Sequence, residues 1–227
     1  MSEFNIEVAG GSSVRLPTAG KYCDRDIVIT ATGGGGGSGG GGELPEGYRR
    51  CDYIQFTGNQ VVDTGIICNQ NTKIKAAFTR EKSSTNYLLG VASSDNKASV
   101  TAYLGGSFRF GDKSASKTPN TNEDTFYSAI LSGSELTITN SKTSISGVND
   151  FETVGTLLIG TCRSASGAVG VAQFVGKVPF VAIWQGEELV MKLIPVTDGN
   201  GVYRFYDIVS KTFFDSVTST PLEGGDL

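Results

Sequence analysis

The sequence predicts an all-β protein: a two-sheet sandwich or jelly roll, preceded by a small β segment and a glycine tether. Short stretches that alternate polar and apolar residues recur along the chain with turn residues between them, which is typical of strands. No window shows the spacing of apolar residues that an amphipathic helix requires. No blade-length repeat is present, which argues against a propeller and favours a sandwich.

The glycine tract at 33–42 reads GGGGGSGGGG and divides the chain. A tract without larger side chains cannot pack, so it behaves as a flexible coil that spans roughly 15–20 Å. It is either a natural tether or a linker introduced by engineering, and both readings separate two units. We therefore predict a small β attachment or oligomerisation segment at 1–32, a flexible linker at 33–43 and a β-sandwich at 44–227.

The segment before the tether contains two or three short strands. Phe4, Ile6 and Val8 alternate with polar residues, and residues 26–30 form a second strand pattern. So few strands cannot hold a core in water on their own. We expect this segment to self-associate or to dock on a larger partner.

The region after the tether contains many short strand patterns separated by turns. Clear hairpin signals are Ser132-Gly133-Ser134, Gln185-Gly186 and the run Asp-Gly-Asn-Gly at 198–201. The predicted strands cover residues 53–56, 61–63, 72–79, 87–92, 100–104, 107–110, 124–132, 135–139, 143–148, 156–161, 168–174, 176–184, 187–195, 202–207 and 212–214.

The amino-acid composition argues against several classes of function. The chain has 227 residues, a formal net charge of −4 and no histidine, so the commonest general base and zinc ligand is missing. We expect no enzyme, although two carboxylates alone can serve a glycosidase. No basic stripe is available for nucleic acid. The short basic runs at 49–50 and 80–82 are predicted to be solvated strand ends.

The four cysteines are Cys23, Cys51, Cys68 and Cys162, and none lies in a CxxC motif. We expect reduced, mostly buried thiols rather than a zinc site or a disulfide framework. No apolar stretch approaches the roughly 20 residues of a membrane helix, and the first residues lack the pattern of a secretory signal. The sequence therefore predicts no membrane insertion.

Two parts of the chain resemble phage proteins. Residues 44–67, LPEGYRRCDYIQFTGNQVVDTGII, resemble the opening of a domain common in phage and prophage structural proteins of gut bacteria. The closing third resembles the same domain in the same order, at residues 174–178, 182–184, 193–196, 201–203, 206–209 and 212–214. Residues 16–29 are similar to a segment of phage tail and virion proteins, whereas residues 80–150 match no pattern we can name.

The resemblance implies a fold and a role. The domain belongs to the concanavalin A-like lectin and laminin-G-like superfamily of two-sheet jelly rolls. The chain would then be a virion structural protein, such as a tail or head fibre or an appendage, assembled in the cytoplasm of the host bacterium. Residues 1–32 would bind other virion proteins or form a homo-oligomer, with a trimer as the usual state of such fibres. The sandwich would bind a host-surface carbohydrate.

Two alternatives stay open at this point. The sandwich is a purely structural capsid or tail decoration that binds no host ligand, or it is a glycan hydrolase. Adjacent Glu187 and Glu188 point to opposite faces of a strand, so they do not form the carboxylate pair that hydrolysis requires. We therefore predict no catalytic residues.

Ligand contacts are expected on the polar loops at 93–97 and 111–123, because loops carry variable recognition residues. The candidate glycan-binding residues are Asp95, Asn96, Lys97, Asn120 and Asn122. The same loops offer hard oxygen ligands to calcium, but their spacing is not that of a calcium loop. We expect no metal site and no cofactor, with calcium as the alternative.

Four other residues are predicted to be structural. Asp63 and Asp207 are expected to accept hydrogen bonds from backbone amides in the turns that follow them. Trp184 lies in an apolar run and is predicted to be a core residue rather than a sugar-stacking one. Pro195 is predicted to end an edge strand.

Overall fold

The computed structural model describes residues 44–81, 86–92, 98–115, 118, 121–139, 141–163 and 173–226. All of these residues except Leu44 belong to one compact unit, Pro45–Leu227. The β segment predicted at 1–32, the tether at 33–43 and Cys23 lie outside the described residues.

The described part of the chain is all β, which confirms the predicted fold class. It contains seventeen strands and no helix, and so no helix that could cross a membrane. The strands are β1 (Tyr48–Arg50), β2 (Tyr53–Thr57), β3 (Val62–Asn69), β4 (Thr72–Arg80), β5 (Asn86–Val91), β6 (Ser99–Leu104), β7 (Phe108–Gly111), β8 (Lys113–Ala115), β9 (Phe126–Ser132), β10 (Glu135–Ile138), β11 (Ser141–Ser144), β12 (Glu152–Ile159), β13 (Val175–Gln185), β14 (Glu188–Asp198), β15 (Tyr203–Asp207), β16 (Thr212–Phe214) and β17 (Glu223–Gly225).

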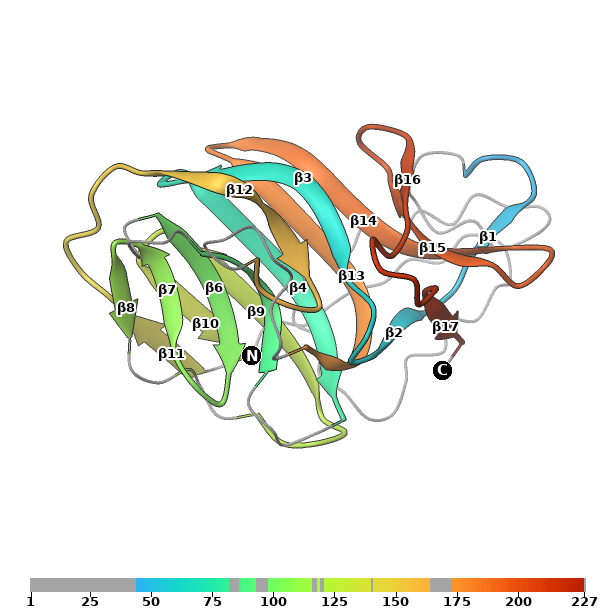
Figure 1. Ribbon diagram of the computed structural model, residues 1–227, viewed down its shortest axis with the longest axis horizontal. Coiled ribbons are helices and arrows are strands. Elements are labelled where there is room, and N and C mark those ends of the chain that lie inside the picture. Colours follow the sequence, from blue (N-terminus) through green and yellow to red (C-terminus); the bar gives the residue numbers. More distant parts are fainter. Residues whose placement is uncertain are drawn as a thin grey trace, which may run out of the picture. The chain divides into compact units, whose positions relative to one another are not determined.

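The strands form two antiparallel sheets. The larger has the order β11-β10-β9-β4-β13-β14-β15-β16, with β1 paired to β14, β2 to β13 and β17 to β2. The smaller has the order β3-β12-β5-β6-β7-β8. The smaller sheet faces β9, β10, β4 and β13, while β14 continues into an extension made with β15, β16 and β1 (Figure 1). The described residues form a two-sheet antiparallel β-sandwich.

The core lies between the two sheets and follows from the alternation along each strand. In β4, Ile74, Ala76 and Phe78 are buried, whereas Lys73 and Lys75 point to the outer face. The ring of Phe78 stacks on Tyr127 at 5.5 Å between centroids and meets Phe174 edge-on at 6.0 Å. Burial of each such ring stabilises the fold by about 1.5–3 kcal/mol.

Pro195 does not end an edge strand, so that prediction was wrong. Strand β14 continues past Pro195 to Asp198. Its pairing with β13 reaches Leu193, and pairing with β1 starts at Val196 on that side. Pro195 therefore lies where β14 changes partners, and its missing N–H breaks no ladder there.

Three of the four shortest strands were not predicted. β1, β8 and β17 have three residues each, which shows little alternation. β16, also of three residues, was predicted at 212–214. β8 lies inside the predicted loop at 111–123. β11 ends at Ser144 rather than 148, and most of the predicted strand at 168–174 lies outside the described residues.

Arg80 also differs from its prediction, because it is buried rather than solvated. Its side chain is 3% exposed at the end of β4. Its Nη1 donates to the carbonyl of Thr121 at 3.2 Å and to the hydroxyl of Thr121 at 2.8 Å. These bonds anchor the segment before β9. Arg49 of the other basic run is exposed, and Nη1 contacts Asp226 at 3.0 Å.

The three cysteines of the described region are free and buried, as predicted. Burial is the largest cause that raises the pKa of Cys51 to about 11 and the pKa values of Cys68 and Cys162 to about 12. At pH 8 these thiols should therefore be protonated and resist alkylation in the native protein, since the thiolate is the nucleophile. Mass spectrometry after iodoacetamide should show modification of these three positions only when the protein is unfolded first. Equal labelling in the native state would contradict the burial.

Candidate functional site

Three turns meet at one end of the larger sheet and line a hollow: the β9–β10 and β13–β14 hairpin turns and the turn that joins β3 of the smaller sheet to β4. β4 lies in the middle, with Lys73 paired to Trp184 of β13 on one side and to Ser132 of β9 on the other. The hollow has a volume of about 370 Å³ and is lined mostly by polar groups. Its lining residues are Gln70, Asn71, Thr72, Lys73, Ser132, Gly133, Trp184, Gly186 and Glu187.

Trp184 lies at this hollow, and its prediction as a core residue was wrong. Ile183 points into the core with no exposed surface, so the next side chain along β13 must face outward. Trp184 is accordingly half-buried on the outer face. The Nζ of Lys73 lies 5.2 Å from the centroid of its ring. The flat indole is therefore available at the surface, beside a cationic group.

Hydrogen bonds hold two of the three turns together. The hydroxyl of Thr72 donates to Oε1 of Gln185 at 3.0 Å, and Nε2 of Gln185 donates to the carbonyl of Ile67 at 2.9 Å. The amide of Gly186 donates to the carbonyl of Asn71 at 3.0 Å. These two walls of the hollow are thus held together before any ligand arrives, which lowers the entropy cost of binding.

Glycine is required at two positions of the rim. Gly133 and Gly186 have φ values of +56° and +62°, the left-handed conformation that tight hairpin turns need. A Cβ at either position would meet no atom within 4 Å. The requirement is conformational rather than steric, and the space above both turns is open.

The chemistry of the hollow suits a polar ligand with an apolar face. Trp184 offers a ring to stack against and an indole N–H donor, and Lys73 adds an ammonium donor. Ser132 and Asn71 supply hydroxyl and amide groups, and Glu187 supplies a carboxylate acceptor. A sugar ring presents both features, with C–H groups on one face and hydroxyls around its edge.

The glycan-binding residues predicted on loops are mostly untested. Asp95, Asn96, Lys97 and Asn120 lie outside the described residues, so their role stays a prediction. The backbone amide of Asn122 donates to the hydroxyl of Tyr127 at 2.6 Å. The structure thus ties the backbone of Asn122 to β9, and Asn122 is not among the residues that line the hollow.

Asp63 accepts a backbone hydrogen bond, as predicted. Its Oδ1 accepts from the amide of Gly65 at 3.0 Å. Its Oδ2 also forms an ion pair with Arg163, whose guanidinium contacts the hydroxyl of Thr156 at 3.1 Å. The carboxylate links β3 to the end of β12, which is a structural role.

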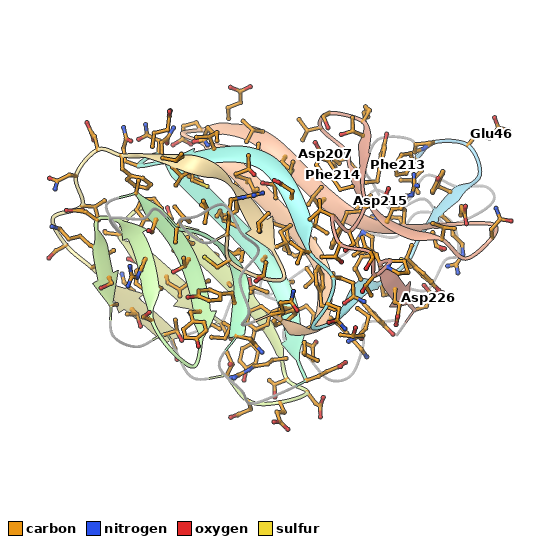
Figure 2. The ribbon with its side chains drawn as sticks, viewed as in Figure 1. Glu46, Asp207, Phe213, Phe214, Asp215 and Asp226 are labelled. Carbon is orange, nitrogen blue, oxygen red and sulfur yellow. The ribbon has the colours of Figure 1, made fainter. Side chains whose placement is uncertain are left out.

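Asp207 is a buried hydrogen-bond acceptor at the β15–β16 turn, also as predicted. It has no exposed surface, and it lies near Phe213, Phe214 and Asp215 in the extension of the larger sheet (Figure 2). Burial by itself raises the pKa of Asp207, but hydrogen bonds from Ser210, Lys192 and Val209 outweigh it and leave the pKa below its ordinary value. The carboxylate is therefore charged at neutral pH, and its hydrogen bonds come from its own turn and from Lys192 of β14.

A metal site was predicted to be absent, with calcium as the alternative. Among the described residues, no three His, Cys, Asp or Glu side chains gather closely enough to hold a metal ion. The loop at 93–97 and part of the segment at 120–124 lie outside the described residues. Calcium binding at these loops stays a prediction.

Sequence reasoning missed the hollow as a site, although one signal was present. Phe180, Ala182 and Trp184 alternate with Val181 and Ile183, so one of the two sets must face outward. Gly186 and Glu187 follow Trp184 closely, but the remaining lining residues, at 70–73 and 132–133, are distant in sequence, and nothing in their local pattern connects them to Trp184.

Comparison with known proteins gives a fold likeness and no family. No protein-family model matches the chain, and no curated protein matches it. A solved structure that it resembles is a native heptameric SAP-like pentraxin from Limulus polyphemus, with 14% identity and a TM-score of 0.44. The match covers 59% of this chain and 75% of the pentraxin chain. The likeness concerns the fold and assigns no ligand, partner or activity to this protein.

Proposed function

We propose that this protein is a non-enzymatic, glycan-binding virion protein of a bacteriophage. Its lectin-like sandwich binds a host-surface carbohydrate at the hollow around Trp184. The observation that carries this proposal is the outward, half-buried indole, which lies between polar turns whose positions are already fixed. Aromatic rings at a surface are costly to leave in water, and a sugar face covers such a ring well.

The absence of catalysis is part of the proposal. The hollow has one carboxylate among its lining residues, that of Glu187. Hydrolysis with retention needs a second carboxyl group about 5 Å away, and inversion needs one at about 6.5–9.5 Å. The neighbouring Glu188 starts β14 and is not among the lining residues. Binding without turnover is the function that this donor set supports.

The virion assignment is supported by the resemblance of residues 16–29 and 44–67 to phage structural proteins. In this proposal residues 1–32 attach to other virion proteins or form a homo-oligomer, such as a trimer. The glycine tract lets each sandwich reach the cell surface. A shallow polar hollow gives weak binding per copy, and several tethered copies would raise the avidity by orders of magnitude. Neither nucleic acid nor membrane insertion is involved.

Replacement of Trp184 with alanine should weaken glycan binding about tenfold or more, because the stacking surface is lost. The measurement is binding of the full chain, displayed as a multimer on beads, to an array of bacterial surface glycans and to intact cells. Phe180→Ala is the matched control, since Phe180 is also a half-buried aromatic on the outer face of β13. Circular dichroism verifies that both variants are folded.

Three results would count against the proposal. Equal loss in Trp184→Ala and Phe180→Ala would remove the hollow as the binding site. Release of a soluble oligosaccharide during incubation would indicate a hydrolase. No binding by the wild-type chain to any glycan or cell would favour a decoration protein, and immunogold labelling of particles would then locate it.

A further inference from the structure

The charged groups that line the hollow balance each other. Among the described residues of the lining, Lys73 carries a positive charge and Glu187 carries a negative one. The other lining residues are glycines or carry amide, hydroxyl or indole side chains. The charges of the lining therefore sum to zero, although the chain as a whole has a formal net charge of −4.

The ammonium group of Lys73 already has a favourable position in the free protein. Its Nζ lies 5.2 Å from the centroid of the Trp184 ring, and a cation over an indole is attracted by the electron-rich face of the ring. The register places Lys73 between Trp184 and Ser132. An anionic ligand would have to replace the contact with Trp184, so it gains only the difference between the two interactions.

The carboxylate of Glu187 has no such partner. Glu187 is exposed in the turn between β13 and β14, and within the described part of the chain no Lys or Arg forms an ion pair with it. Glu188, the next residue, is also exposed and adds a second negative charge at the same turn. An acidic substituent in the hollow would therefore meet uncompensated charge of its own sign, which disfavours binding.

Sugar hydroxyls suit Lys73 and Glu187 better than a charged substituent does. A hydroxyl both donates and accepts, so the hydroxyls of one ring can donate to Glu187 and accept from Lys73. A carboxylate has no hydrogen to donate to Glu187, and an ammonium group has no lone pair that accepts from Lys73. Hydrogen bonds with one charged partner are stronger than those between neutral groups, so an uncharged sugar gains from both residues.

The hollow is small, which brings the substituents of a bound sugar close to these two groups. Its volume of about 370 Å³ lies near the lower end of the roughly 300–1,000 Å³ that is usual for small-molecule sites. It therefore accommodates a short stretch of glycan, of one or two sugar units. The edge of a ring that stacks on Trp184 lies beside Lys73 on the neighbouring strand and beside the turn that carries Glu187.

We propose that the hollow selects an uncharged sugar unit, and that Glu187 is the residue that excludes acidic glycans from it. This inference rests on the proposed glycan-binding function and names the class of glycan. Charge repulsion at an exposed site is screened by salt, whereas stacking and hydrogen bonds to hydroxyls depend on salt much less. Binding of a neutral glycan should therefore change little with ionic strength, while the weaker binding of its acidic counterpart should improve as salt is added.

The test uses the full chain, displayed as a multimer, on an array of bacterial surface glycans together with polygalacturonate and chitosan. Each acidic glycan is also presented with its carboxyl groups reduced to alcohols, and each glycan with free amino groups is also presented after N-acetylation. The variant Glu187→Lys reverses the charge at the hollow. Glu223→Lys is the matched control, because Glu223 is also exposed but lies in β17, which pairs with β2 at the opposite end of β13 from Trp184.

The wild type should bind at least one neutral glycan and bind its charged counterpart about fivefold more weakly. In Glu187→Lys the ratio of acidic to neutral affinity should rise about tenfold. The reason is that one repulsion is removed and one attraction is added, each worth a factor of up to about five at an exposed site. Glu223→Lys should keep that ratio within about twofold of the wild type, since its charge lies beyond the screening length of roughly 10 Å.

Two results would overturn the inference of an uncharged sugar and leave the proposed function in place. The first is wild-type binding to charged glycans that equals or exceeds binding to their neutral counterparts. The second is an equal ratio of acidic to neutral affinity in Glu187→Lys and Glu223→Lys. Binding of the wild type to no glycan on the array would overturn both the inference and the proposed function.

Discussion

Replacement of Gly176 with alanine should lower the free energy of unfolding by about 4 kcal/mol or prevent folding, the largest effect we expect from one methyl group. A Cβ on Gly176 would lie 1.9 Å from the carbonyl oxygen of Thr79 and 2.8 Å from Cζ of Phe174. Its φ of +153° is also a conformation that other residues rarely adopt. β13 cannot move aside, because Gly176 pairs with Phe56 of β2 and with Arg80 of β4.

Urea unfolding followed by tryptophan fluorescence measures the effect, with soluble yield as a second readout if the variant does not fold. Gly201→Ala is the matched control. Gly201 has a φ of +79°, but a Cβ there meets no atom within 4 Å. Replacement of Gly201 with alanine should lower the free energy of unfolding by only about 1–2 kcal/mol, which is the backbone strain. Similar unfolding midpoints for the two variants would show that the close approach at Gly176 is absent in solution.

The fold class was predictable because it depends on local patterns. Alternation identifies strands such as β4, where Ile74 and Phe78 are buried and Lys73 and Lys75 are not. The hairpin between β14 and β15 was predictable from turn chemistry, since Asp198 accepts the amides of its own turn and Gly201 adopts positive φ. The order of strands within each sheet was not predictable from the sequence. For example, β4 pairs with β13, which is distant in sequence, and no local pattern encodes that contact.

The candidate site was less predictable than the fold. The run at 181–184 is uniformly apolar, so it was read as fully buried, whereas β13 buries Val181 and Ile183 and turns Trp184 outward. Arg80 shows the converse error. A charged residue beside Glu81 looks solvated, but Nη1 of Arg80 donates to the carbonyl and the hydroxyl of Thr121 inside the protein. In both cases the burial of the side chain depends on contacts with residues that are distant in sequence.

Replacement of Asp207 with asparagine should lower the free energy of unfolding at pH 7 by about 3 kcal/mol. Oδ1 accepts from the amides of Lys192 at 2.7 Å and Val209 at 3.1 Å. Oδ2 accepts from the amide and hydroxyl of Ser210 at 3.0 and 2.6 Å. Asparagine has one acceptor oxygen, so its NH₂ group would face two donors, and at least one buried amide would lose its partner.

The pH dependence of this loss separates a charged acceptor from simple packing. The pKa of Asp207 is lowered in the folded protein, while an unfolded aspartate titrates near about 3.9. A lowered pKa stabilises the fold above the unfolded value, and that stability is lost as the pH falls through the folded pKa. The difference between wild type and Asp207→Asn should therefore be constant from about pH 6 to 8 and shrink below about pH 4.

Asp198→Asn is the control for this experiment, because Asp198 also accepts two backbone amides but belongs to an exposed turn. It should cause a much smaller loss of stability, since water replaces the missing acceptor there. If the difference in the free energy of unfolding between wild type and Asp207→Asn persists at low pH, the lost stability comes from packing and not from the charge of Asp207. Such a result would also show that the protonated, neutral carboxyl of Asp207 holds the β15–β16 turn as well as the charged carboxylate does.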